Sequence, residues 1–346
     1  MAKLWSMVKS AFTISIEDQI QYRPRTVQIG PHIIIVTSAE FGATVPRLTQ
    51  KFAKWSVQHG GHTIWGCAPL LSSYLVKSGV TTGKRVLELG SGMGVCGLIA
   101  HRVGASEVVL TDGDQSLLSH LHENIMVNIG FYGEEKSEEG CRPAHSCHLR
   151  WGNNKDAIQL MEELGPFDVV LGSDLIYPEA VKKTEVLALM GTKVRDFFST
   201  AAASLRAGGI LLVTHELRPP VEECLQLLAV NATDAGFGEP TLAQMDRKLN
   251  RLVLSIPWIT KDWYESKDGT EESVLRAWAN LFPILEVRGP VADRLGAEAR
   301  TGHGWLDPHC SVVAAGMGVG GTWGKDLSAG VEVKLGGPSN EDWQFS

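Results

Sequence analysis

The sequence predicts a doubly wound α/β fold, in which parallel strands alternate with helices. Short apolar runs alternate with segments of helical period from residue 84 to residue 256. The run at residues 167–172 is almost wholly apolar, as expected for a central strand covered on both faces. A third observation is the apolar run 86–89, which is followed by closely spaced glycines and then by the apolar segment 95–103. A strand that turns through glycines into a helix is typical of a nucleotide-cofactor site.

Before this alternation, two apolar runs predict an N-terminal hairpin. Residues 26–29 and 32–36 flank Gly30 and Pro31, a turn-forming pair. Residues 47–56 have no clear period and are interpreted as a linker. Pro69 then suits the start of a helix over residues 69–77, because proline is favoured in the first helical turn.

The elements of the alternating region follow from the same patterns. Strands are expected at residues 86–89, 108–112, 146–151, 167–172, 209–214 and 252–256. Helices are expected at residues 95–103, 155–164, 179–205 and 221–235, and Gly236 closes the last of these. A further helix is expected to begin after Asp114, which can cap it. Residues 131–143 form a long, acid-rich connection that is either disordered or functional.

Three parts of the chain are predicted. An extension with the hairpin covers residues 1–59, the α/β domain covers residues 60–258, and residues 259–346 form a largely disordered C-terminal extension. Within that extension, residues 262–281 are expected to hold a short helix. From Gly302 onward, glycines recur without a hydrophobic period, which predicts a disordered tail.

Composition excludes several classes of protein. The net charge of −7 argues against nucleic acid as the main partner, because phosphate binding requires a basic face. No apolar run approaches the ~20 residues of a membrane span. Six cysteines without a C-x-x-C pair predict reduced thiols. We therefore expect a cytoplasmic monomer, with a nuclear or an organellar location as alternatives.

The glycine-rich turn leaves two cofactors open. Gly92, Gly94 and Gly97 fit the dinucleotide pattern G-x-G-x-x-G, which is weak evidence alone. Glu88 favours S-adenosylmethionine over NAD, because a carboxylate inside a strand is costly unless it holds the turn or binds the ammonium of the cofactor. Asp112, at the end of the next strand, suits the ribose hydroxyls of either cofactor.

Over roughly residues 60–258, the chain resembles the seven-β-strand methyltransferases, and within them the family-16 group. The resemblance rests on residues 64–66 (Ile-Trp-Gly), 87–94 (Leu-Glu-Leu-Gly-Ser-Gly-Met-Gly), 149–152 (Leu-Arg-Trp-Gly) and 173–177 (Ser-Asp-Leu-Ile-Tyr). It implies a Rossmann-like seven-stranded sheet, S-adenosylmethionine as cofactor and methyl transfer to a lysine of a protein substrate. The acid-rich loop and the tail beyond residue 258 depart from the family pattern, and nothing is carried over to them.

These segments supply the candidate site. Cofactor contacts are expected from Trp65, Glu88, Gly90, Ser91, Gly92, Gly94, Asp112, Trp151 and Ser173. Trp151 is placed along the adenine and Trp65 near the sulfonium, whereas Ser173 offers backbone groups. Asp174 and Tyr177 are the predicted catalytic residues. A carboxylate at Asp174 stabilises the positive charge that grows on the amine, and Tyr177 walls the lysine channel.

Alternatives remain at this point. Asp174 can instead cap a helix, while Trp65, Trp151 and Tyr177 can be ordinary packing residues. The group Cys141, His145, Cys147 and His148 contains potential metal ligands, but its spacing fits no zinc module, so no metal is expected. Residues 215–218 (His-Glu-Leu-Arg) either line the substrate side or form a solvated loop. Other functions left open are methylation of a protein histidine or a small molecule, NAD-dependent redox chemistry, and a non-catalytic interaction role.

Overall fold

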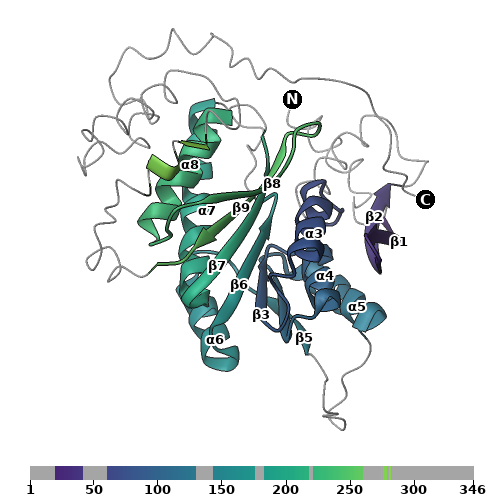
Figure 1. The fold of residues 1–346 in the computed structure, drawn as a ribbon. Coiled ribbons are helices and arrows are strands. Elements are labelled where there is room, and N and C mark those ends of the chain that lie inside the picture. Colours follow the sequence, from purple (N-terminus) through teal and green to yellow (C-terminus); the bar gives the residue numbers. More distant parts are fainter. Residues whose placement is uncertain are drawn as a thin grey trace, which may run out of the picture.

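The computed structural model describes residues 20–41, 61–129, 143–175, 183–217, 221–259, 274, 276–278 and 280–281. Its centre is a seven-stranded sheet in the order β5-β4-β3-β6-β7-β9-β8 (Figure 1). The strands are β3 (Arg85–Leu89), β4 (Glu107–Asp112), β5 (Ala144–His148), β6 (Phe167–Ser173), β7 (Leu205–Glu216), β8 (Thr241–Asp246) and β9 (Arg251–Pro257). The first five are parallel, and β9 pairs antiparallel with β7 and with β8. The predicted doubly wound, seven-stranded fold is confirmed.

Helices cover both faces of the sheet, as Figure 1 shows. One face carries α3 (Cys67–Ser78), α4 (Val95–Val103) and α5 (Leu118–Ile129), the last preceded by the 3₁₀ turn η2 (Gln115–Leu117). The other face carries α6 (Asn154–Leu164), α7 (Lys183–Ser204) and α8 (Val221–Asp234). Each face has its own buried apolar core. Among the described helices, none is both long and apolar enough to cross a bilayer.

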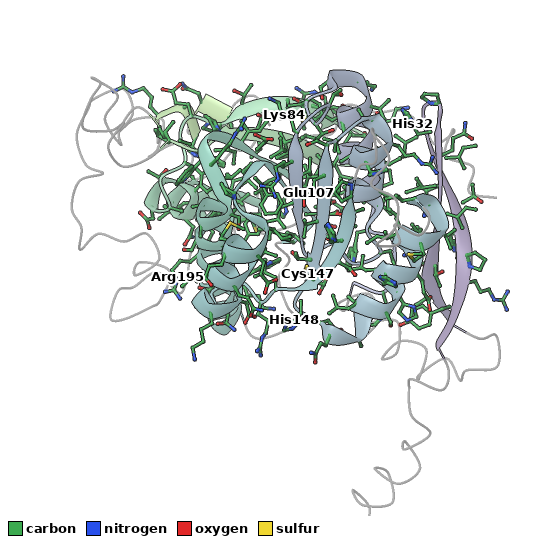
Figure 2. The ribbon with its side chains drawn as sticks, turned by 90° about the horizontal axis from the view of Figure 1, so that it is seen from below. His32, Lys84, Glu107, Cys147, His148 and Arg195 are labelled. Carbon is green, nitrogen blue, oxygen red and sulfur yellow. The ribbon has the colours of Figure 1, made fainter. Side chains whose placement is uncertain are left out.

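Side chains of β3 alternate between the two cores. Leu87 and Leu89 pack into the core that contains α7, whereas Val86 packs into the core beneath α4. Glu88 follows the phase of Val86, because successive side chains of a strand point to opposite faces. Its carboxylate is therefore directed toward α4. Lys84, just before β3, and His148, at the end of β5, lie at opposite ends of the sheet in Figure 2.

The hairpin and most sheet elements occur where the sequence predicts them, with different ends. The hairpin is longer than expected, with β1 at Ile20–Ile29 and β2 at His32–Phe41. The third predicted strand is shifted, because β5 starts at Ala144 and ends at His148 rather than at Trp151. β8 was missed, since its side chains are mostly half-exposed and its alternation of apolar and polar residues is interrupted at Leu242 and Ala243, where the pairing register shifts.

Two parts outside the predicted α/β domain also contribute to the cores. Val27, Ile29, Ile34 and Val36 of the hairpin are buried in the core that contains α3, α4 and α5. Val274, Trp278 and Leu281 lie in the opposite core and are helical, as predicted for part of residues 262–281. The three domain boundaries remain predictions. The expected linker at 47–56, all but Pro143 of the acid-rich connection and the tail from Gly302 lie outside the described residues.

Candidate functional site

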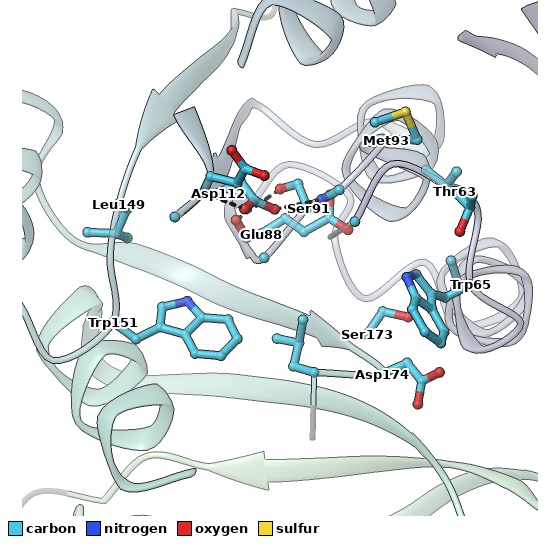
Figure 3. Close-up of a pocket in the computed structure, with 18 of the residues that line it drawn as sticks. Thr63, Trp65, Glu88, Ser91, Met93, Asp112, Leu149, Trp151, Ser173 and Asp174 are labelled. Atoms are coloured by element: carbon cyan, nitrogen blue, oxygen red, sulfur yellow. Dashed lines mark hydrogen bonds between the residues drawn. The ribbon is translucent and has the colours of Figure 1, made fainter. Parts of the chain in front are cut away.

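A cavity of about 590 Å³ opens at the carboxyl ends of β3, β4 and β6. Its position is the topological switch point, because the chain leaves β3 toward β4 on one side and β6 adds on the other side. The lining includes nine predicted site residues: Trp65, Glu88, Gly90, Ser91, Gly92, Asp112, Trp151, Ser173 and Asp174. Figure 3 labels seven of them around this cavity, all but Gly90 and Gly92.

The turn after β3 depends on glycine. Gly90, Gly92 and Gly94 have φ angles of 61°, 52° and 80°, in the left-handed region that other residues rarely adopt. A Cβ on Gly92 would lie 2.8 Å from the carbonyl oxygen of Gly61. Gly94 is absent from the cavity lining and is the N-cap of α4, so its role is to form the turn.

Hydrogen bonds fix this turn to β4. The amide of Ser91 donates to the carbonyl of Thr111 over 2.8 Å, and the amide of Thr111 donates to Ser91 Oγ over 3.0 Å. Both hydroxyls donate to the carbonyl of Glu88, over 3.2 Å from Ser91 and 2.8 Å from Thr111. The backbone that faces the cavity is therefore held in place before any ligand binds.

Glu88 is a buried carboxylate at the N-terminus of α4. Its Oε2 accepts a hydrogen bond of 2.9 Å from the amide of Gly97, in the first turn of that helix. Burial raises the pKa of Glu88 to about 7, although the bond from Gly97 acts in the opposite direction. Because this carboxylate takes one of the helix-end amides that would otherwise bind phosphate, the site suits a cationic ligand better than the pyrophosphate of NAD.

Asp112 holds the other side of the turn. Its Oδ2 accepts from the amide of Gly92 over 3.0 Å, and its Oδ1 accepts from the amide of Asp114 over 2.9 Å. Burial raises the pKa of this carboxyl group. Each carboxylate oxygen has a further acceptor position. A pair of ribose hydroxyls matches that arrangement.

Two tryptophans lie at opposite ends of the cavity (Figure 3). Trp151 packs edge-to-face against Phe197, with ring centroids 5.4 Å apart, and approaches Gly90. Trp65 lies beside Ser173 and Asp174 in Figure 3. The residue after it, Gly66, accepts a 3.0 Å hydrogen bond from Arg251. One end of the cavity therefore holds Trp151 near Leu149, and the other end holds Trp65 near the carboxylate of Asp174.

Asp174 has an unusual backbone for a buried residue. It is 3% exposed and has a φ of 56°, a left-handed conformation that aspartate adopts only occasionally. Its amide donates to the carbonyl of Thr214 over 2.9 Å, which holds it at the end of β6 beside β7. Backbone conformations of this kind are concentrated at functional sites. Tyr177 lies outside the described residues.

The cavity also contains residues that the sequence did not indicate as site residues. They include Thr63, Met93, Leu175, Lys193 and Asp196. Lys193 and Asp196 belong to α7, far along the chain, and no local pattern relates them to the glycine turn. Thr63 directly precedes the Ile-Trp-Gly segment, and Met93 lies within the glycine turn. Their closeness to these motifs in the chain could have identified them as site residues.

One group of described residues has ligand-type atoms within 4.8 Å of one another, namely Cys67, Asp174 and Glu216. Arg251 already donates to Glu216 over 2.9 Å, which favours a charge cluster over a metal site. In the group considered from sequence, His145 lies 3.8 Å from Glu107 and His148 lies 3.2 Å from the carbonyl of Gly113. Cys141 lies outside the described residues.

Known proteins that are similar to this chain are lysine methyltransferases by name. Residues 49–193 match the family model described as lysine methyltransferase. The chain is 32% identical over 186 residues to the protein N-terminal and lysine N-methyltransferase EFM7 of Cryptococcus neoformans, covering 51% of this chain and 60% of that protein. It is 32% identical over 137 residues to the protein N-lysine methyltransferase METTL21A of Danio rerio, covering 38% and 54%.

A third relative is the calmodulin-lysine N-methyltransferase of Arabidopsis thaliana, 35% identical over 96 residues that cover 28% of each chain. This chain therefore spans about 60% of the length of the EFM7 proteins that it matches. The resemblance predicted from the four motifs is confirmed over residues 49–193.

Proposed function

We propose that this protein is an S-adenosylmethionine-dependent methyltransferase that acts on a lysine side chain of a protein substrate. The observation that carries the proposal is the acid-lined cavity at the switch point, with Glu88 and Asp112 near the glycine turn and Asp174 near Trp65. The match of residues 49–193 to the lysine methyltransferase model supports the same conclusion.

The cavity residues fit S-adenosylmethionine in chemistry. The acceptor positions of Asp112 suit ribose hydroxyls, and the carboxylate of Glu88 suits an ammonium group. The flat ring of Trp151 suits an adenine, and Gly90 and Gly92 present backbone without a Cβ at the cavity. The face of a tryptophan ring attracts cations. The positively charged sulfonium is therefore expected beside Trp65.

When bound, S-adenosylmethionine would supply a methyl group from its positively charged sulfur, and the sulfur–methyl bond would break to leave S-adenosylhomocysteine. The carboxylate of Asp174 would stabilise the positive charge that develops on the lysine nitrogen and would hold that nitrogen in place. Free lysine has a pKa of ~10.4, so the amine must lose a proton, which passes to water, before it attacks. Burial of Asp174 strengthens its interaction with a charged amine, because little water competes. The role of Tyr177 beside the lysine stays a prediction from the sequence, since this residue lies outside the described residues.

A second acceptor has support of its own. The relative from Cryptococcus neoformans carries both protein N-terminal and lysine methylation in its name. An N-terminal α-amine is a primary amine like lysine, and the same carboxylate would stabilise its charge. Methylation of a histidine or a small molecule remains an alternative outcome of the test. A cytoplasmic location and a monomeric state remain predictions.

The test is incubation of the purified protein with radiolabelled S-adenosylmethionine and fractionated cell extract. The protein should label a discrete protein band, and mass spectrometry of the digested band should place the methyl group on a lysine. Asp174→Asn should abolish labelling while cofactor affinity stays nearly unchanged. Glu162→Gln, which removes an exposed carboxylate from α6, is the matched control and should label normally. A protein that binds the cofactor but labels no protein would contradict the proposed substrate class, and loss of cofactor binding in Asp174→Asn would contradict its assigned role.

A further inference from the structure

The hairpin of β1 and β2 lies outside the residues that match the family model, yet it contacts the fold at several defined points. It packs on the face formed by α3, α4 and α5, at the edge of the molecule that carries His32 in Figure 2. Apolar contacts alone would dock it there. Its polar contacts are different, because two of them lead to backbone that lines the cavity.

The first connection runs from β2 through Asn124 of α5. The amide of Thr37 donates to Asn124 Oδ1 over 2.7 Å, and Asn124 Nδ2 donates to the carbonyl of Met93 over 3.0 Å. Met93 stands between Gly92 and Gly94 and lines the cavity. Asn124 is 1% exposed, so its two hydrogen bonds are made where water cannot replace them. One side chain thus joins the hairpin to the glycine turn.

One turn further along α5, Asn128 repeats this interaction with the same strand. The amide of Ile35 donates to Asn128 Oδ1 over 2.8 Å, and Asn128 Nδ2 donates to the carbonyl of Ile35 over 2.6 Å. The side-chain amide pairs with β2 as a neighbouring strand would. This second contact fixes the position of β2 along α5 and so fixes the position of Thr37.

The second connection runs from β1 through His62. The hydroxyl of Tyr22 lies 2.5 Å from His62 Nδ1, and the amide of Ala39 in β2 donates to the carbonyl of His62 over 2.9 Å. The neighbours of His62 in the chain, Gly61 and Thr63, both line the cavity. The hairpin therefore holds the loop that leads to Trp65.

His62 also faces the carboxylates of the cavity. Its Nε2 lies 3.6 Å from Asp114 Oδ2, and the amide of Asp114 donates to Asp112 Oδ1. Burial lowers the pKa of His62, which favours a neutral ring. A neutral ring that accepts at Nδ1 from the Tyr22 hydroxyl carries its proton at Nε2, toward Asp114. The chain of contacts thus reaches the proposed ribose acceptor.

From these contacts we propose that the N-terminal hairpin supports the cofactor site from outside the cavity, with Tyr22 and Asn124 as positioning residues. They set the affinity for S-adenosylmethionine by holding the loop around His62 and the turn at Met93. The inference rests on the proposed function, because the ligand concerned is S-adenosylmethionine. It adds to that function a requirement for residues outside the matched family region.

The test is calorimetric measurement of Kd for S-adenosylhomocysteine, with the thermal midpoint Tm measured in parallel. Tyr22→Phe removes one hydroxyl and keeps the ring that stacks on His120 at 3.8 Å. It should raise Kd about three- to tenfold, the effect expected for one hydrogen bond. Thr26→Val is the matched control, because it removes an exposed hydroxyl from the same strand, and it should leave Kd unchanged.

A double-mutant cycle separates positioning from general loosening of the hairpin. In a His62→Phe background, Tyr22→Phe should change Kd by less than about 1.5-fold, because the bond is already absent. A Kd for Tyr22→Phe equal to that of the unmodified protein would overturn the inference, whether or not Tm falls. An unmodified protein that binds no S-adenosylhomocysteine would overturn the proposed function itself, which is a different result.

Discussion

Glu88 offers a quantitative test of the cofactor site. Its carboxyl group is buried and has a pKa raised to about 7, so about half of the molecules carry a proton there at neutral pH. The proposed function places the ammonium of the cofactor beside this group. A nearby positive charge favours the carboxylate and lowers its pKa. Binding of S-adenosylhomocysteine should therefore release protons from Glu88.

The size of the effect follows from the pKa of about 7. Full deprotonation on binding releases about 0.9 proton per site at pH 6.0 and about 0.5 at pH 7.0. The same linkage strengthens binding by about eightfold from pH 6.0 to pH 7.5. The range stops at pH 7.5 so that the amine of the ligand stays largely protonated.

The assay is titration calorimetry in two buffers that differ in ionisation enthalpy, which gives the number of protons released. Glu88→Gln keeps an acceptor for the amide of Gly97 but cannot titrate, so it should remove this release and flatten the pH dependence of Kd. Fewer than about 0.2 protons released at pH 6.0 by the unmodified protein would refute the argument. Equal release by both proteins would assign the protons to another group, such as Asp112.

The same pKa also affects stability without ligand. The folded-state value of about 7 lies above the ordinary value of 4.5, so burial favours the protonated form. This contribution to stability is fully present below about pH 4.5 and is lost as the pH rises through about 7. Glu88→Gln should therefore show a smaller loss of Tm between pH 5 and pH 8 than the unmodified protein.

Three further predictions concern single side chains. Gly92→Ala should abolish measurable cofactor binding and lower Tm, because residue 92 has a φ of 52° and a Cβ there would lie 2.8 Å from the carbonyl oxygen of Gly61. An unchanged Kd for S-adenosylhomocysteine in calorimetry would show that the turn tolerates a side chain. Trp151→Ala should raise the Kd for S-adenosylhomocysteine by about tenfold or more, because stacking on the adenine is lost. A Kd equal to that of the unmodified protein would favour an ordinary packing role for Trp151. Trp278→Ala should destabilise the fold by about 3–5 kcal/mol in urea unfolding, because the side chain is 2% exposed in the core; a change below about 1 kcal/mol would contradict its burial.

Local patterns in the sequence predicted those features that local physics controls. The turn after β3 was predictable because glycine alone tolerates the φ angles of that turn. Asp114 was identified as a cap, and its side chain accepts from the amide of Ser116 at the start of η2. Gly236, with a φ of 84°, follows α8 as predicted. Most of the site residues followed from the rule that ligands bind at the carboxyl ends of parallel strands.

Other features depend on contacts between distant segments, and no local pattern indicates them. β8 forms a strand because β9 offers it a pairing edge, although its own residues lack a clear period. The left-handed backbone of Asp174 is imposed by its neighbours, since its amide is bonded to the carbonyl of Thr214 on β7.

Residues adjacent in the chain are enough to predict the alternation of strands and helices, the glycine turn, and the acids that lie within β3, at the end of β4 and directly after β6. Only the tertiary structure showed that Glu88 binds the N-terminus of α4 and that the hairpin reaches the cavity through Asn124 and His62. Trp278, far beyond the predicted domain, likewise belongs to its core. Burial, strand pairing and long-range hydrogen bonds are set by packing of the whole chain, whereas glycine turns and the succession of strands and helices along the chain depend on nearby residues.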